Sequence, residues 1–156
     1  WEFSCDRNHE LLAVVDDVMR QNPALRAPVR NVSASSPVSI DLDFEGQTGR
    51  NGRIYALLAS MSGTSPGWSL GGDILPLNQD WLTSASMQSA NGSLFQQNIG
   101  LLDANGDATA TLNLAGVAPL PPALVGLRIN LAGWVFAAPG ALQGEPTNAV
   151  DLFIDS

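Results

Sequence analysis

The stretch Val38-Ser39-Ile40-Asp41-Leu42-Asp43-Phe44 alternates strictly between apolar and polar residues. Successive side chains of a β-strand point to opposite faces of a sheet, so the apolar residues share one face and Asp41 and Asp43 share the other. This alternation is typical of an antiparallel sheet with one face against the core and one in water. The stretch predicts a half-buried strand with a well-determined register, because a slip of one residue would bury both carboxylates.

Beyond residue 36 the chain contains short β-forming runs, separated by Gly, Pro, Asn and Asp at intervals of about ten residues. No repeat of fixed period is found. We predict an all-β fold, an antiparallel β-sandwich of about seven to eight strands. The predicted strands cover residues 38–44, 53–60, 81–87, 94–102, 108–114, 124–136 and 148–154, with a weaker strand at 74–77. A hairpin turn is predicted at 103–107, where Asn105-Gly106 tolerates positive φ and joins two antiparallel strands.

The first part of the chain has a different period. In residues 6–21 apolar residues recur at the three-and-four spacing of an amphipathic α-helix, which Asp6 can cap and Asn22-Pro23 ends. Residues 24–36 contain Pro28 and a Ser-rich stretch, which predicts a linker. The predicted division is therefore an N-terminal helix and linker at residues 1–30 and a β-sandwich domain at residues 31–156. The helix is either the tail of a preceding domain or an element that packs across an open end or face of the sandwich.

Composition limits the classes of partner. Charged residues make up 14% of the chain, the net charge is −8 at neutral pH, and all seven basic residues are Arg. A negative balance repels phosphate groups, which argues against nucleic acid and anionic membrane surfaces as partners. Gly, Pro or polar residues interrupt every apolar run before the roughly 20 residues needed to cross a bilayer, so no membrane span is expected.

The chain begins at Trp1 without an initiator Met or a signal peptide, as a processed chain or a fragment would. We therefore expect a preceding domain of the same parent protein as one partner. Cys5 is the single cysteine, so it is either a free thiol or was disulfide-bonded to a residue upstream.

One catalytic motif requires an explanation. Gly67-Trp68-Ser69-Leu70-Gly71 matches the G-x-S-x-G nucleophile elbow of serine hydrolases. An elbow needs a strand before the serine, a helix after it and a later histidine, but a loop precedes Ser69, Pro76 opposes a helix, and His9 comes earlier in the chain. We interpret the motif as a chance match and predict no catalytic residues.

Two groups of residues remain as candidates for binding. Asp103, Asn105 and Asp107 have the oxygen spacing that opens a calcium loop, although the glutamate that completes an EF-hand is missing and a polar turn explains them equally. We predict no cofactor and no other metal, with calcium as the alternative at this turn. Trp68 and Trp81 lie in or beside polar segments, where their rings could stack on sugars or pack internally.

Several strand and turn segments from about residue 35 onward carry a family resemblance. They are residues 52–58, 60–67, 75–78 with Asp80, 100–106 and Thr147-Asn148-Ala149-Val150. With these segments the chain resembles a poorly characterised family of C-terminal β-rich modules of large secreted or surface bacterial proteins. The resemblance implies a secreted or cell-surface location and a fold more than an activity, and it places Ser69 in a variable loop.

These observations leave three hypotheses. The first is a noncatalytic secreted accessory module that attaches, spaces or displays a partner domain. The second is a carbohydrate-binding module that uses Trp68 or Trp81 on a cell-surface or polysaccharide ligand. The third is the C-terminal fragment of a secreted α/β-hydrolase, whose catalytic residues lie upstream and whose last helix would be residues 6–21.

Overall fold

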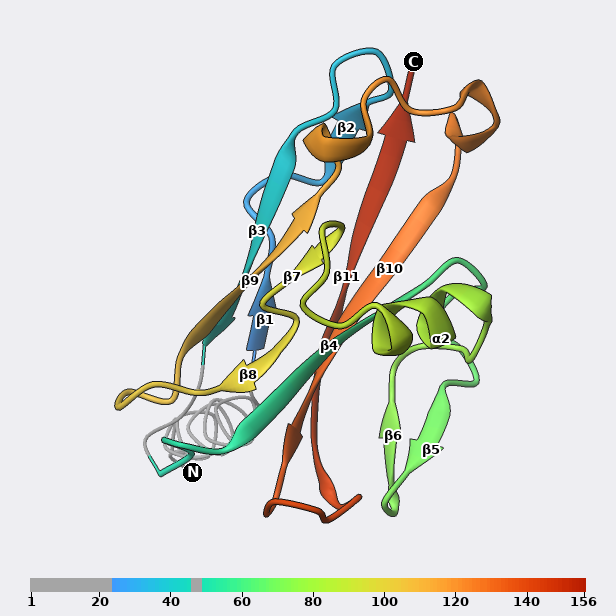
Figure 1. Ribbon diagram of the computed structural model, residues 1–156. Helices are drawn as coiled ribbons and strands as arrows, with labels where there is room; N and C mark the ends of the chain where they lie inside the picture. The colour runs from blue at the N-terminus through green and yellow to red at the C-terminus, as the bar shows by residue number, and fades with distance from the viewer. Residues whose placement is uncertain (1–23, 46–48) are drawn as a thin grey trace, which may run out of the picture.

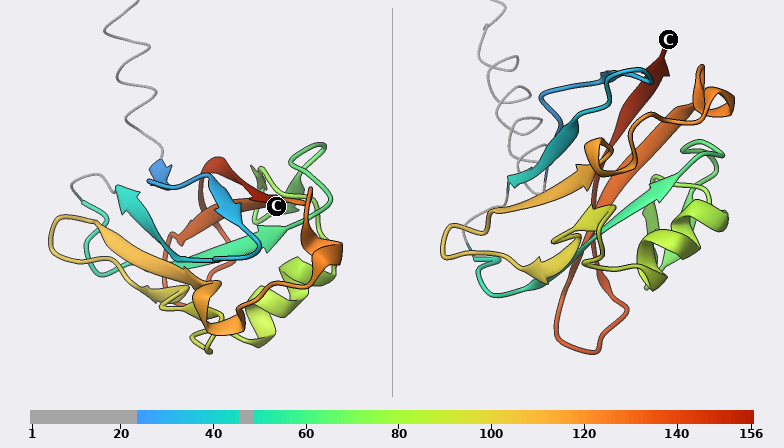
Figure 2. Two further views of the ribbon diagram at one scale, coloured as in Figure 1. Left: turned by 90° about the horizontal axis from the view of Figure 1, so that it is seen from above. Right: turned by 45° about the horizontal axis from the view of Figure 1, so that its top comes forward.

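The computed structural model describes residues 24–45 and 49–156, and two β-sheets in this part face each other (Figures 1 and 2). The predicted β-sandwich is confirmed, whereas the predicted helix at 6–21 lies outside the described residues. The first sheet has the order β1 (Ala24–Arg26), β3 (Ser39–Glu45), β9 (Ala108–Asn113), β7 (Phe95–Gln96). The second sheet has the order β2 (Asn31–Ser33), β11 (Gly144–Asp155), β10 (Arg128–Phe136), β4 (Ile54–Ser60), β8 (Ile99–Leu101).

The main core fills the space between the two sheets. The alternation of β3 is realised as predicted, with Ile40, Leu42 and Phe44 buried and the polar positions exposed. The rings of Phe44 and Tyr55 meet across the sheets with their centroids 4.6 Å apart. Each such side chain contributes about 1.5–3 kcal/mol through its removal from water, so these contacts hold the two layers together.

The second sheet is covered on both faces. In β4, every residue from Tyr55 to Ser60 is buried. The strands β5 (Trp68–Leu70) and β6 (Asp73–Leu75) form a small hairpin. The outer face of β4 packs, together with Trp134 of β10, against Leu75 at the end of this hairpin and Leu77 just after it. A strand with both faces in apolar surroundings does not alternate, which explains the nearly continuous apolar run of β4.

The prediction of a strand at 81–87 is wrong, because this segment is the helix α2 (Trp81–Gln88). Asp80 caps the helix: its carboxylate accepts from the Thr83 N–H at 3.0 Å, and its own N–H donates to the Thr83 hydroxyl at 3.3 Å. Leu82, Thr83 and Ser86 form the buried face. The reciprocal cap stabilises a helix that the β-forming residues Trp81, Leu82 and Thr83 do not themselves favour.

The helix α2 protects an edge of the second sheet. β8 pairs with β4 only from Ile54 to Ala56. Beyond that point, the Leu57 N–H donates to the Asn98 carbonyl at 2.6 Å, and the Asn98 side chain donates to the carbonyls of Leu57 and Ser86. The buried Asn98 therefore joins the helix to the strand edge and satisfies backbone groups that would otherwise be left without partners.

The predicted strand at 94–102 divides into β7 and β8, which belong to different sheets. Gln97 adopts a φ of 51°, and its carbonyl accepts a hydrogen bond from the Tyr55 hydroxyl at 2.6 Å. The prediction that residues 103–107 join two paired strands is also wrong. This turn connects β8, which pairs with β4, to β9, which pairs with β3 and β7 in the other sheet. The turn itself is closed by the Asp103 N–H, which donates to the Asp107 carbonyl at 2.8 Å.

The predicted linker at 24–36 is also corrected. β1 pairs with β3 in the first sheet and β2 runs parallel to β11 in the second. The Asn148 side chain of β11 accepts from the Leu25 N–H at 2.8 Å and donates to the Leu25 carbonyl at 3.0 Å, which ties the two sheets together along one side. The assignment of the residues before 24 to a preceding domain stays a prediction.

Two further segments differ from expectation. The predicted strand at 124–136 begins only at Arg128, and the 3-10 turns η1 (Ala115–Val117) and η2 (Pro122–Leu124) precede it. They connect β9 to β10 over one end of the sandwich, as Figure 2 shows. Of the helices described, none has the length and apolar character that crossing a membrane requires.

Candidate functional site

The two sheets leave an opening at each end of the sandwich, and the two openings differ in chemistry. One is a cavity of about 140 Å³ with a wholly apolar lining, which we call the apolar socket. Its lining includes Met61, Trp81, Leu112, Val117, Leu124 and Ile154. The other is a wider hollow of about 710 Å³, which we call the polar hollow. The polar hollow is lined by four carboxylates, those of Asp43, Glu45, Asp103 and Asp107.

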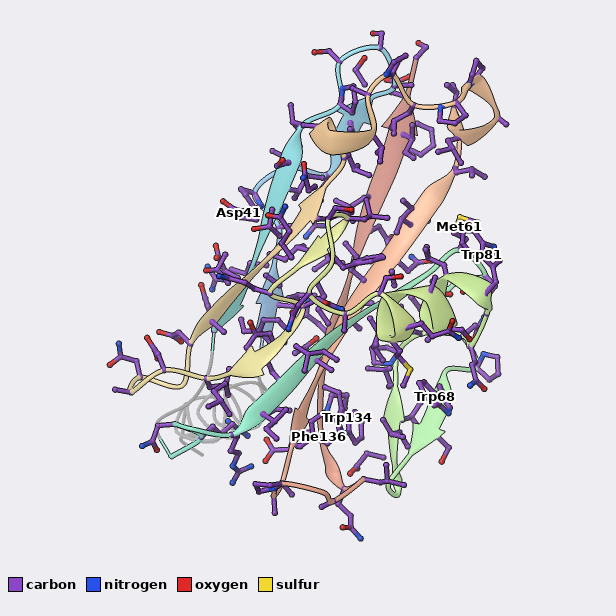
Figure 3. The ribbon with its side chains drawn as sticks, in the orientation of Figure 1. Asp41, Met61, Trp68, Trp81, Trp134 and Phe136 are labelled. Carbon is purple, nitrogen blue, oxygen red and sulfur yellow. The ribbon has the colours of Figure 1, made fainter. Side chains whose placement is uncertain are left out.

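Trp81 stands at the mouth of the apolar socket. It is the first residue of α2 and is 66% exposed, whereas the next residue, Leu82, is buried in the main core. Successive residues of a helix point about 100° apart, so the buried Leu82 directs Trp81 outward. Figure 3 shows Trp81 beside Met61 at the start of α2, and both residues line the socket.

Asp80 positions both Met61 and Trp81. One carboxylate oxygen accepts hydrogen bonds from the N–H groups of Met61 at 2.7 Å and Ser62 at 2.9 Å. The same oxygen accepts from the hydroxyls of Ser60 at 3.0 Å and Ser62 at 2.9 Å. The other oxygen accepts from Thr83 in the cap of α2. A single side chain therefore links the loop after β4 to the start of the helix.

These contacts change the acidity of Asp80. Partial burial of the carboxylate acts to raise its pKa, but the N–H groups of Thr83 and Met61 and the hydroxyls of Ser62 and Ser60 together outweigh it. The net result is a pKa well below the ordinary value for an aspartic acid. Asp80 is therefore ionised at neutral pH, and each of its hydrogen bonds is strengthened by the charge.

The polar hollow contains part of the predicted calcium site. Asp103 and Asp107 line it, whereas Asn105 is not among its lining residues. One oxygen of Asp103 accepts hydrogen bonds from the N–H groups of Asn105 at 2.8 Å and Asp107 at 2.9 Å. These bonds lower the pKa of Asp103, and the bond from Asp107 has the largest effect. This is the arrangement of an Asx turn, in which the side chain holds the backbone of the loop.

Among residues 24–45 and 49–156, no three His, Cys, Asp or Glu side chains group as metal ligands. Calcium at Asp103, Asn105 and Asp107 stays a prediction.

The structure separates the two tryptophans predicted as ligand contacts. Trp68 begins β5, is half-buried, and packs against the cluster of Leu58, Leu75 and Trp134. Figure 3 shows it lower in the molecule than Trp81, next to the β5–β6 hairpin. Trp68 therefore packs against this cluster, whereas Trp81 lines the apolar socket and is the more exposed of the two residues.

Ser69 does not occupy an elbow. It is exposed in the middle of β5, opposite Ile74 of β6, and the Gly71-Gly72 turn that follows it leads into a strand and not a helix. The interpretation of the G-x-S-x-G match as a chance pattern agrees with this geometry. His9 lies outside the described residues.

The sequence indicates Asp80 only as part of the family resemblance and predicts neither its capping role nor the apolar socket. The segment Asp80-Trp81-Leu82-Thr83 carries a capping pattern that could have indicated the helix and the outward direction of Trp81. The socket has no signal of this kind, because its lining comes from segments as distant as Met61 and Ile154.

No family model matches the chain, and no curated protein matches it. Among solved structures, the chain is similar to the D0-D1 domain of intimin with a TM-score of 0.41 and 10% sequence identity. That match covers 86% of this chain and 50% of the intimin chain, so this chain spans half the length of that structure.

Proposed function

We propose that the chain is a noncatalytic interaction module of a secreted or cell-surface protein, which attaches, spaces or displays a partner, and that its contact surface is the end that carries Trp81. The observation that carries the proposal is the position of this residue. Trp81 is 66% exposed at the mouth of an apolar cavity, although tryptophan is usually highly buried.

The surroundings of Trp81 suit a contact surface. Val117, which also lines the socket, is 47% exposed, so apolar surface continues from the cavity onto the rim. The Asp80 hydrogen bonds hold the start of α2 in place before any partner arrives. A large aromatic side chain on a fixed backbone has few rotatable bonds to immobilise on binding, and such residues are enriched among those that dominate interface energies.

Catalysis by the chain itself is tested with a panel of ester, peptide and glycoside substrates. We expect no turnover from the purified chain, and no change on Ser69→Ala, because Ser69 lies on an exposed strand. Turnover that disappears in Ser69→Ala would overturn the noncatalytic assignment.

Carbohydrate binding is the second candidate function, and the exposed ring of Trp81 favours it because aromatic faces stack on sugar rings. A glycan array probed with the wild-type chain, Trp81→Ala and Trp68→Ala tests it. Binding lost in Trp81→Ala and kept in Trp68→Ala would establish this function in place of protein attachment. Binding lost only in Trp68→Ala would move the contact surface to the β5–β6 hairpin and contradict the proposal.

The predicted preceding domain of the same parent protein is a candidate partner for this surface. The hypothesis of a secreted α/β-hydrolase upstream, with Cys5 bridged to it, is compatible with the proposal and stays a prediction. It would make the hydrolase the domain that this module attaches or displays.

A further inference from the structure

We infer that the apolar socket receives one aromatic side chain from a protein partner. This inference rests on the proposed function and names the chemistry of the partner. It follows from the size of the cavity, the character of its lining and the exposure of its rim.

The size of the socket limits its occupant to a single ring. Its volume is about 140 Å³. Cavities that hold drug-sized ligands measure roughly 300–1,000 Å³, whereas an engineered apolar cavity of about 150 Å³ in another protein stays dry and binds benzene. A phenyl ring therefore matches the space, and an entire sugar or cofactor does not.

The lining excludes polar occupants. The side chains that form the socket are all apolar, and they come from both sheets, from α2 and from the η1–η2 connection. A hydroxyl or charged group placed there would lose its water without gaining a hydrogen-bond partner. Met61 adds a thioether, which contacts aromatic rings favourably and adjusts to their shape.

The rim favours a protein partner over a free aromatic molecule. Trp81 and Val117 are 66% and 47% exposed at the mouth of the socket. A free ring inside the socket would leave most of this rim in water. A side chain attached to a protein brings neighbouring surface with it, which covers Trp81 and Val117 and adds to the apolar area buried.

The test compares two variants that add the same side chain to neighbouring positions. Leu124 of η2 lines the socket and is half-buried, so Leu124→Trp places an indole in the cavity. Val125, the next residue, is exposed and does not line the socket, so Val125→Trp places the same indole outside it. The urea midpoint of each variant establishes that it is folded.

Two probes are used with the full chain: toluene, and a random peptide library displayed on phage. We expect selected peptides to share a Phe, Tyr or Trp. We expect Leu124→Trp to lower the affinity for both probes by roughly tenfold to a hundredfold, which corresponds to the burial of one ring. We expect Val125→Trp to leave both affinities unchanged. In the wild-type chain, toluene should shift the methyl NMR signals of Leu112 and Ile154 and leave those of the exposed Ile74 unchanged.

The outcomes separate this inference from the proposed function. Peptides that lose binding in Trp81→Ala but bind Leu124→Trp normally would overturn the socket and leave the contact surface standing. Peptides unaffected by either change would contradict both. Selected peptides without an aromatic residue, or toluene binding without any peptide selected, would also overturn the inference. If Leu124→Trp does not fold, the methyl shifts in the wild-type chain decide whether the socket admits a ring.

Discussion

The apolar socket and the polar hollow lie between the same two sheets, yet one accepts only apolar groups and the other presents four carboxylates. The difference comes from the connections at each end. At the socket, α2 and the 3-10 turns supply Trp81, Val117 and Leu124. At the hollow, the turn after β8 and the end of β3 supply Asp103, Asp107 and Glu45. In this sandwich the sheets determine where the openings lie, and the connections determine what each opening can bind.

Among changes at the two openings, the largest effect on stability is expected from enlarging the socket. Leu112 is fully buried in the main core and also lines the socket. Leu112→Ala should lower the free energy of unfolding by about 3 kcal/mol, because it removes buried apolar surface and leaves a larger cavity. Urea denaturation measures the change. The control is Leu101→Ala at the polar hollow, where the side chain is exposed. Equal losses in the two variants would contradict the contrast between the ends.

Removal of the Asp80 carboxylate comes next. Asp80→Ala should lower the free energy of unfolding by about 2 kcal/mol, the combined cost of a helix cap and of charge-assisted hydrogen bonds to a neighbouring loop. Asp80→Asn, which keeps one oxygen acceptor, should lower the free energy of unfolding by less than Asp80→Ala does. Asp103→Ala is the matched change at the polar hollow, and we expect a smaller shift of its urea midpoint because the Asp103 carboxylate is exposed. A larger shift for Asp103→Ala would reverse this ranking.

Acid should remove the stabilisation that the Asp80 carboxylate provides. The pKa of Asp80 lies below its unfolded value of about 3.9, so its contribution to stability is present above that pH and is lost as the pH falls toward the folded pKa. The urea midpoint of the wild-type chain should therefore fall as the pH drops below about 4. In Asp80→Asn this fall should be shallower, with a remainder of the same sign from Asp103, whose pKa is also lowered. Parallel curves for the two proteins would show that Asp80 is not the group responsible.

The smallest effect on stability is expected at Trp81. Because its side chain is largely exposed, Trp81→Ala should change the free energy of unfolding by less than about 0.5 kcal/mol while it removes binding at the socket. Trp134→Ala, at a fully buried indole in the cluster with Leu58 and Leu75, should unfold the protein or destabilise it severely. A substantial loss of stability in Trp81→Ala would show that Trp81 supports the fold and would remove the main argument for a contact surface.

The outcome of the sequence predictions follows from how local each signal is. β3 was predicted within one residue, because alternation records directly which face of a strand is buried. The segment 81–87 is helical although its residues include β-forming ones, because the Asp80 cap stabilises the start of α2. The predicted strand at 94–102 could not be divided from its composition, because the left-handed backbone at Gln97 depends on contacts with Tyr55 of another strand.

For the candidate site, the sequence indicates Trp81 as a possible contact residue but does not indicate the cavity beside it. In the sequence, Trp68 and Trp81 are equally good candidates, because both lie in or beside polar segments. Only tertiary packing distinguishes them: Trp68 packs against the cluster of Leu58, Leu75 and Trp134, whereas Trp81 is exposed. Met61 and Leu124 gave no indication of a shared cavity, because they lie far apart along the chain.

By itself, the sequence determined the class of the fold, the polarity of the outer face of β3 and the presence of a turn at Asn105-Gly106, because these depend on the conformational preferences of a few adjacent residues. The tertiary structure alone decided which sheet each strand joined, that α2 closed the edge of β4, and that one end of the sandwich remained hollow and apolar. Periodicity specifies which side chains must be buried, whereas the partners that bury them are selected by packing between distant segments.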